Sequence, residues 1–134
     1  MGATSRRTFL IVFASVEVAT GLGLQILAPV VFAKLLGLHS VTVDTILIAR
    51  ILGAALLAIG VASWMAKSDT LNPAQFGLLI GILIYNTTAS ILLAYAGVVL
   101  KMIGVMLWPT VAIHAILMVW GLSCLLPYRT AGNP

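Results

Sequence analysis

Six polar or ionisable side chains stand inside long apolar stretches of this sequence. They are Glu17, Gln25, Arg50, Asn86, Thr110 and His114. Ionisable groups are costly inside a membrane and usually mark a functional site there. A carboxylate, a guanidinium and an imidazole in one apolar cavity can bind a small polar head group, such as the carbonyl of a quinone. We therefore take these six residues as candidate ligand-binding residues.

His114 also admits two other kinds of chemistry. A neutral imidazole nitrogen can ligate the metal of a haem or a chlorophyll. The apolar run that holds His114 and Trp120 resembles light-harvesting antenna helices, although Thr110 stands where those helices usually have Ala. Glu17 and His114 together are also typical of a small transporter or a proton-conducting protein. The last reading is weakened because the sequence shows no internal repeat.

The chain lacks the patterns of the common catalytic and metal sites. It has one cysteine, Cys124, which excludes an internal disulfide and a cysteine metal cage. No HExxH, CxxC or P-loop pattern occurs, and Asp44 and Asp69 belong to opposite membrane faces. The sequence therefore gives no catalytic residue and no metal site other than His114. It indicates an auxiliary component rather than an enzyme that works alone.

Composition places the chain in a membrane. Of its 134 residues, 62% are hydrophobic and only 7% are charged. Soluble domains carry about 25% charged residues, so too little polar surface remains here to face water. The length fits a single domain, and the net charge of +4 is scattered rather than clustered as in nucleic-acid-binding surfaces. We expect an integral membrane protein with the lipid bilayer as its environment and no nucleic-acid partner.

Four apolar segments are long enough to cross a bilayer, which takes about 20 residues. They cover residues 8–28, 44–66, 74–97 and 103–126. Asn72 and Pro73 predict the start of the third segment, as an N-cap followed by proline. Pro109 should either kink the fourth segment or mark its true first turn. Because the connections are short, we expect an all-α, four-helix, up-down-up-down bundle.

The stretch that follows the first segment is expected to form a separate element. Pro29 is read as the end of the first span, and Val30 to His39 is too short to cross the membrane again. Lys34 and His39 lie among apolar residues there. This pattern predicts a short helix in the outer membrane interface.

The basic residues predict the orientation of the chain. Four of them fall on one side of the predicted topology and two on the other, namely Arg6, Arg7, Lys67 and Arg129 against Lys34 and Lys101. The excess on one side predicts that both termini are cytoplasmic. Residues 5–10, SRRTFL, resemble a twin-arginine export signal, but Glu17 and three further apolar segments favour a cytoplasmic anchor for an inserted chain.

Helical periodicity indicates which residues share a face with each polar side chain. The four stripes are Glu17, Gly21, Leu24 and Ala28; Arg50, Ala54, Leu57, Ala58 and Val61; Asn86, Ile82, Ser90 and Leu93; and His114, Thr110, Met118 and Gly121. Small residues beside a polar group usually mark a helix-packing face, so we expect all four stripes to point inward.

On this reading, Arg50 bends toward Glu17 and lies near Gln25, and Arg50→Leu is tolerated only if Glu17 is changed too. Alternatively, these side chains only hold helices together, since interhelical polar contacts contribute about 0.6 kcal/mol on average. A buried ion pair, however, is a poor source of stability.

A motif in the first half resembles a known family. The residues are Pro29-x-x-Phe32-x-x-Leu35-Leu36-Gly37-Leu38, then Ala49-Arg50-x-x-Gly53, with Gly60. They resemble the DoxX-like group of small four-helix bacterial membrane proteins. The resemblance implies an inner-membrane protein, and named members of the group are linked to quinone-coupled thiosulfate oxidation. Arg50 is the one charged position that the resemblance carries over.

Two functional hypotheses follow. The first is an auxiliary membrane subunit with a polar pocket for a quinone-like or other small ligand, working with another membrane protein. The second is a structural subunit of a larger redox or photosynthetic complex, in which His114 contacts haem or chlorophyll.

Overall fold

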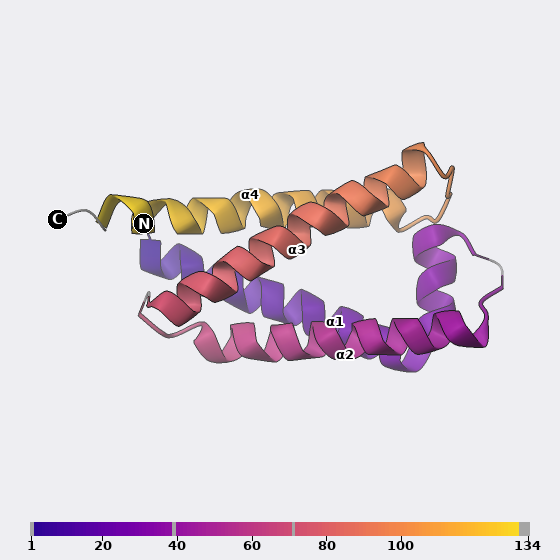
Figure 1. Ribbon diagram of the computed structural model, residues 1–134, viewed down its shortest axis with the longest axis horizontal. Helices are drawn as coiled ribbons and strands as arrows, with labels where there is room; N and C mark the ends of the chain where they lie inside the picture. The colour runs from indigo at the N-terminus through magenta and orange to yellow at the C-terminus, as the bar shows by residue number, and fades with distance from the viewer. Residues whose placement is uncertain (1, 39, 71, 132–134) are drawn as a thin grey trace.

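The computed structural model describes residues 2–38, 40–70 and 72–131. These residues form four α-helices: α1 (Gly2–Leu36), α2 (Val43–Ala66), α3 (Pro73–Val98) and α4 (Leu107–Ala131). The helices run along the long axis of the molecule, and the start of α1 lies at the same end as the end of α4 (Figure 1). The all-α bundle predicted from the sequence is confirmed.

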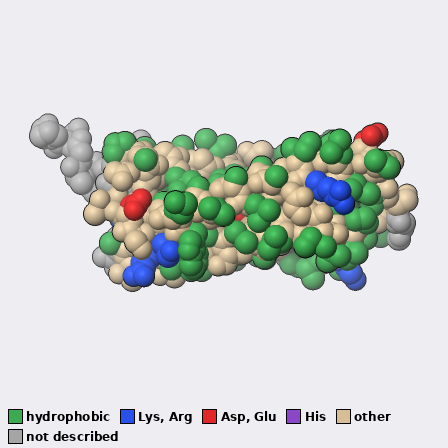
Figure 2. Space-filling view, turned by 90° about the horizontal axis from the view of Figure 1, so that it is seen from below, with side chains coloured by type: hydrophobic (Ala, Val, Ile, Leu, Met, Phe, Trp, Pro, Cys, Tyr) green, Lys and Arg blue, Asp and Glu red, His purple; other side chains and the backbone are tan. Residues whose placement is uncertain are grey.

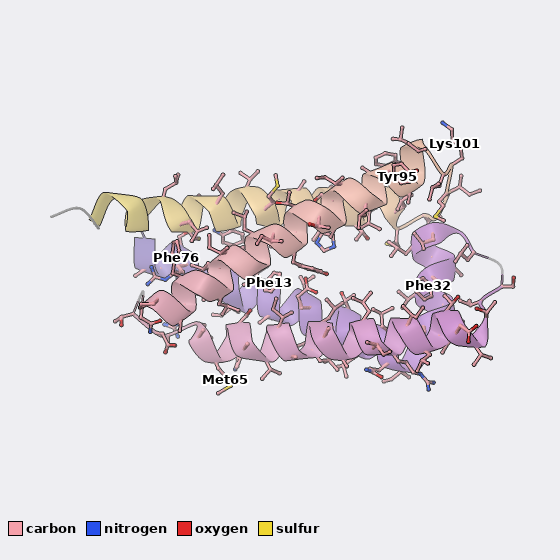
Figure 3. All side chains as sticks on the ribbon, in the orientation of Figure 1. Phe13, Phe32, Met65, Phe76, Tyr95 and Lys101 are labelled. Atoms are coloured by element: carbon pink, nitrogen blue, oxygen red, sulfur yellow. The ribbon has the colours of Figure 1, made fainter. Side chains whose placement is uncertain are left out.

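All four helices are long and apolar enough to cross a membrane. Hydrophobic side chains cover the middle of the face shown in Figure 2, and charged side chains gather mostly near its two ends. Met65 on α2 points away from the other helices, whereas Phe13 on α1 points into the bundle (Figure 3). A large apolar exterior with charged ends is typical of a small multi-pass membrane protein.

Local signals in the sequence set the starts of two helices. The Asn72 side-chain oxygen accepts a hydrogen bond from the Gln75 N–H at 2.8 Å, and Pro73 is the first residue of α3. Thr42 caps α2 in the same way through the Thr45 N–H, at 3.3 Å. Both caps satisfy backbone donors that have no partner inside the helix. The predicted Asn-Pro start of α3 is confirmed.

The bundle consists of two helical hairpins. α1 packs mainly against α2, α3 packs against α4, and α1 also contacts α4. In the part of the chain that the structure describes, α2 and α3 make little contact although they are consecutive. Gln75 joins them at their connected ends, where its amide donates to the Ala66 carbonyl at 2.7 Å. The expected antiparallel neighbours are therefore found, but the middle pair is loosely packed.

Glycines bring α1 and α2 together. A Cβ atom built on Gly21 would lie 2.7 Å from the Gly53 carbonyl oxygen, and one on Gly53 would lie 2.8 Å from the Gly21 carbonyl oxygen. A Cβ on Gly60 would lie 2.9 Å from a methyl carbon of Val18. Such contacts are closer than any side chain permits, so the two backbones meet directly along this seam.

The inward stripe predicted for α1 is confirmed, because Glu17, Gly21, Leu24 and Ala28 are all buried. The stripe predicted for α2 is wrong. Arg50, Ala54 and Ala58 are exposed, and the buried residues of α2 are Ala49, Gly53, Leu56, Gly60 and Ser63. Gly53 and Gly60 permit the close approach to α1, whereas a guanidinium on that face would have to be desolvated.

The first helix does not stop at Pro29. α1 continues to Leu36 with a kink at Leu27, whose φ of −123° and ψ of 31° are not helical. Proline lacks an N–H and its ring crowds the carbonyl four residues earlier, here that of Gln25, so the helix bends instead of ending. A short helical segment therefore follows the kink near the predicted position, but as a bent continuation of α1 and not as a separate helix, and His39 lies outside the described residues. The segment after the kink turns across the end of the bundle (Figure 1).

A loop from the second hairpin holds this segment in place. The Met106 N–H donates to the Lys34 carbonyl at 2.9 Å, and Gly104 packs directly on the backbone of Leu35 and Leu36. α4 then begins at Leu107, with Pro109 in its first turn. Of the two roles expected for Pro109, the structure shows the second.

Candidate functional site

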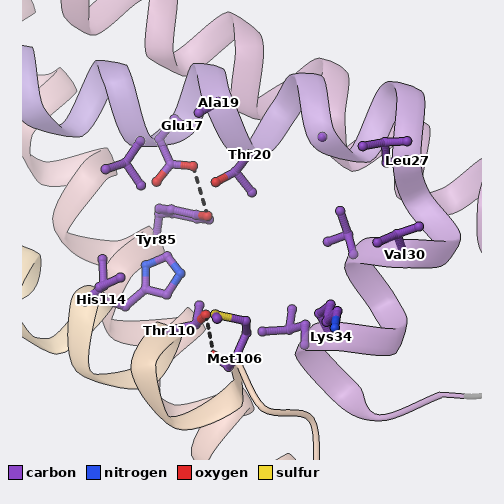
Figure 4. A pocket seen from close by; sticks show the side chains of 15 residues that line it. Glu17, Ala19, Thr20, Leu27, Val30, Lys34, Tyr85, Met106, Thr110 and His114 are labelled. Carbon is purple, nitrogen blue, oxygen red and sulfur yellow. Dashed lines mark hydrogen bonds between the residues drawn. The ribbon is translucent and has the colours of Figure 1, made fainter.

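A cavity of about 460 Å³ lies between α1, α3 and the start of α4. Its polar side chains come from three helices, and the segment of α1 after the kink forms one wall (Figure 4). The lining includes Glu17, Thr20, Lys34, Tyr85, Thr110 and His114, with apolar residues between them. This volume falls in the range of small-molecule sites, about 300–1,000 Å³.

Glu17 is the most deeply placed ionisable group of the cavity, with 1% of its surface exposed. The Tyr85 hydroxyl donates a hydrogen bond to Glu17 Oε2 at 3.2 Å. The other carboxyl oxygen, Oε1, is buried and has no hydrogen-bond partner among the described residues. An unsatisfied buried polar atom costs about 1–3 kcal/mol, so a ligand that bonds to Oε1 would recover this free energy.

His114 is oriented by Asn86. The Asn86 amide nitrogen donates to the Ile82 carbonyl at 2.8 Å, which leaves its side-chain oxygen facing His114 Nδ1 at 3.0 Å. Because that oxygen can only accept, Nδ1 carries the hydrogen and the lone pair of a neutral ring is on Nε2. The His114 ring also meets the Tyr85 ring edge to face, at 5.5 Å between centroids.

The remaining candidate residues divide into two groups. Thr110 lines the cavity, and its hydroxyl donates to the Met106 carbonyl at 2.7 Å. Gln25 lies outside it and donates from its amide to the backbone carbonyl of Arg50 at 2.8 Å. Gln25 and Arg50 are therefore neighbours, as expected, but the contact is to the Arg50 backbone and not to its side chain.

The expected contact between Arg50 and Glu17 is wrong. Arg50 is exposed on α2, whereas Glu17 is buried and bonds to Tyr85. A guanidinium near the end of a membrane helix can extend toward water along its own aliphatic stem, which costs less than burial.

We expect Arg50→Leu to accumulate and fold like the unmodified protein, with a change in the free energy of unfolding of less than about 0.5 kcal/mol. The reason is that the Gln25 bond uses the Arg50 carbonyl, which the substitution retains. The matched control is Ala49→Leu at the fully buried neighbour, where overpacking should cost about 1–3 kcal/mol. Yield and unfolding midpoint measure both effects. If Arg50→Leu folds only together with Glu17→Gln, the side chain is part of the buried cluster after all.

Sequence reasoning missed three lining residues: Thr20, Lys34 and Tyr85. Tyr85 immediately precedes Asn86, near the middle of an apolar segment, and its depth in the segment could have marked it as a partner for Glu17. Thr20 lies three residues after Glu17, so the two side chains lie on nearly the same face of α1, and this spacing could have marked Thr20 as a lining residue. Lys34 was expected in the interface, and the kink of α1 brings it to the cavity instead.

The chemistry available in the cavity is hydrogen bonding and proton exchange. A carboxyl, a phenol, an imidazole and a hydroxyl converge there. Among the described residues, no group of three His, Cys, Asp or Glu side chains could hold a metal ion.

A comparison of the chain with known protein families, curated proteins and solved structures gives no match.

Proposed function

We propose that this protein is an auxiliary membrane subunit that binds a quinone-like head group in the cavity of Glu17, Tyr85 and His114. The observation that carries the proposal is the buried Oε1 atom of Glu17, which has no hydrogen-bond partner among the described residues and belongs to a side chain that lines this cavity. The hydroxyl of a reduced, hydroquinone-type head can donate to Glu17 Oε1, or the carboxyl protonated at Oε1 can donate to a quinone carbonyl, while the ligand ring packs beside those of Tyr85 and His114. Asn86 positions His114, and Thr110 is a further hydroxyl at the wall. Gln25 and Arg50 lie outside the cavity and are not part of the proposal.

The protein would work together with another membrane protein of a bacterial inner membrane. The cavity offers groups that can bind a small ligand and exchange protons with it. The resemblance to DoxX-like proteins in residues 29–60 points in the same direction, toward quinone-linked chemistry. The start of α1 and the end of α4 lie at the same end of the bundle (Figure 1), which is compatible with the proposal that both termini are cytoplasmic.

The test is carbodiimide labelling of carboxyl groups in the membrane-embedded protein. We expect a hydrophobic carbodiimide to label Glu17 and a benzoquinone to reduce that labelling by about tenfold at saturation, because the ligand covers the carboxyl. Asp44 and Asp69 are exposed and serve as internal controls that the quinone should not protect. Mass spectrometry of the peptides measures all three sites. Glu17 labelling that stays constant at saturating quinone would remove the basis of the proposal.

A second candidate function rests on the geometry of His114. Its Nδ1 is hydrogen-bonded to Asn86, and Nε2 has no hydrogen-bond partner in the part of the chain that the structure describes, as in a metal-ligating histidine whose other nitrogen is held by a supporting residue. The protein would then be a structural subunit of a redox or photosynthetic complex that holds haem or chlorophyll. A pigment absorbance band after native purification, lost in His114→Ala, distinguishes this candidate from the first.

A further inference from the structure

A second chamber of about 400 Å³ lies on the side of the bundle where α2 and α3 are loosely packed. The residues that belong to it alone are almost wholly apolar: Leu24, Phe32, Leu52, Leu56, Thr88, Ala89, Leu92 and Leu93. No charged side chain lines it among the described residues. Its chemistry is therefore that of a hydrocarbon site.

The two chambers adjoin each other. They share Thr20, Val31, Leu35, Tyr85, Thr110 and His114 as lining residues. Tyr85 and His114 therefore stand where the chambers meet, with Glu17 on the first side only. The polar chamber lies beside α1 and α4 and the apolar chamber between α2 and α3, and the shared side chains are their common wall.

The apolar chamber opens toward the lipid. Leu52 on α2 and Thr88 and Leu92 on α3 line it and are also exposed on the bundle surface. The opening exists because α2 packs on α1 through glycines, and α3 packs on α4 instead of α2. A molecule dissolved in the bilayer can enter between these helices without crossing water.

We propose that the two chambers together take a single-chain amphiphile from the bilayer, with its head group at Glu17 and Tyr85 and its apolar chain between α2 and α3, and that the chain passes between the side chains that the chambers share. This inference rests on the proposed function and names the class of ligand: a quinone-like head that carries a long hydrocarbon chain. The polar chamber alone accounts for the head. The apolar chamber, which no protein side chain fills, accounts for the chain, since each buried methylene is favourable.

The experiment compares two probes that share one benzoquinone head, one with no chain and one with a decyl chain. The concentration of each probe that halves the carbodiimide labelling of Glu17 gives the affinity of that probe. Ala89→Phe fills the apolar chamber, and Leu52→Trp narrows it from α2 as a second variant. We expect both variants to weaken the decyl probe about tenfold and the chainless probe no more than about twofold. Partition of the decyl chain into the membrane is the same for every variant, so it cancels in the comparison.

Ala58→Phe is the matched control, because Ala58 is exposed on α2 and lines neither chamber. It should bind both probes as the unmodified protein does. Equal weakening of both probes by Ala89→Phe and Leu52→Trp, or no weakening of either, would overturn the inference about the chain and leave the head-group site standing. Failure of both probes to protect Glu17 in the unmodified protein would overturn the proposed function together with this inference.

Discussion

Gly21→Ala should force α1 and α2 apart and lower the free energy of unfolding by about 1–3 kcal/mol. The added Cβ would lie 2.7 Å from the Gly53 carbonyl oxygen and 2.8 Å from Leu57 Cγ. The first of these is a backbone atom of the facing helix, which cannot turn aside as a flexible side chain can. Unfolding in mixed micelles, followed by circular dichroism, measures the loss.

Gly81→Ala is the control for this substitution. Gly81 is also in the middle of a spanning helix, but a Cβ built there meets nothing within 4 Å. Its replacement should leave stability unchanged or raise it by about 0.5–1 kcal/mol, because alanine loses less backbone entropy in a helix. Equal stability of the two variants would mean that α1 and α2 do not approach each other as closely as described.

Asn86→Leu should lower the free energy of unfolding by about 1–3 kcal/mol. It should also weaken the protection of Glu17 by quinone against carbodiimide labelling. Asn86 is fully buried and is the hydrogen-bond partner of His114 Nδ1. Leucine has a similar volume, so packing is kept while the imidazole N–H loses its acceptor and the ring is free to turn. The unfolding midpoint gives the first effect, and half-protection of Glu17 gives the second.

Ser90→Ala is the control that shows whether the loss of any buried polar side chain from α3 has the same effects as Asn86→Leu. Ser90 lies one turn further along α3, and its hydroxyl oxygen is buried without a hydrogen-bond partner among the described residues. Removing it should therefore leave quinone protection unchanged and raise the free energy of unfolding, by at most about 1–3 kcal/mol, because a buried hydroxyl without a partner is destabilising. If Ser90→Ala and Asn86→Leu behave alike, the bond between Asn86 and His114 does not orient the site.

The sequence predicted the inward faces of three helices and failed for one. Glu17, Asn86 and His114 could be placed because each is a buried polar residue that the lipid cannot accommodate. Arg50 misled the assignment of α2, since a long side chain can leave the bilayer from an exposed position. The other residues of α2 gave little guidance, because lipid is as apolar as a helix interface and small residues occur on both faces.

The cavity could not be predicted because it depends on how helices pack. Pro29 is compatible with both the end of a helix and a bend, and only the continuation of α1 to Leu36 separates the two. That bend, and the loop that holds it through Met106 and Gly104, carries Lys34 to the cavity wall. Tyr85 was overlooked because a tyrosine in an apolar segment is ordinary until a carboxyl is found opposite it.

The division into two hairpins has a consequence for biosynthesis. Chains are made from the N-terminus, so α1 and α2 can associate through Gly21 and Gly53 before α3 and α4 have left the ribosome. At that stage Glu17 lies in the bilayer without the Tyr85 hydroxyl, and the cavity has only one wall. Arrival of the second hairpin supplies Tyr85 and His114 together. The cavity is thus completed only when the second hairpin packs against the first. A ligand that is already dissolved in the bilayer can be enclosed at that step.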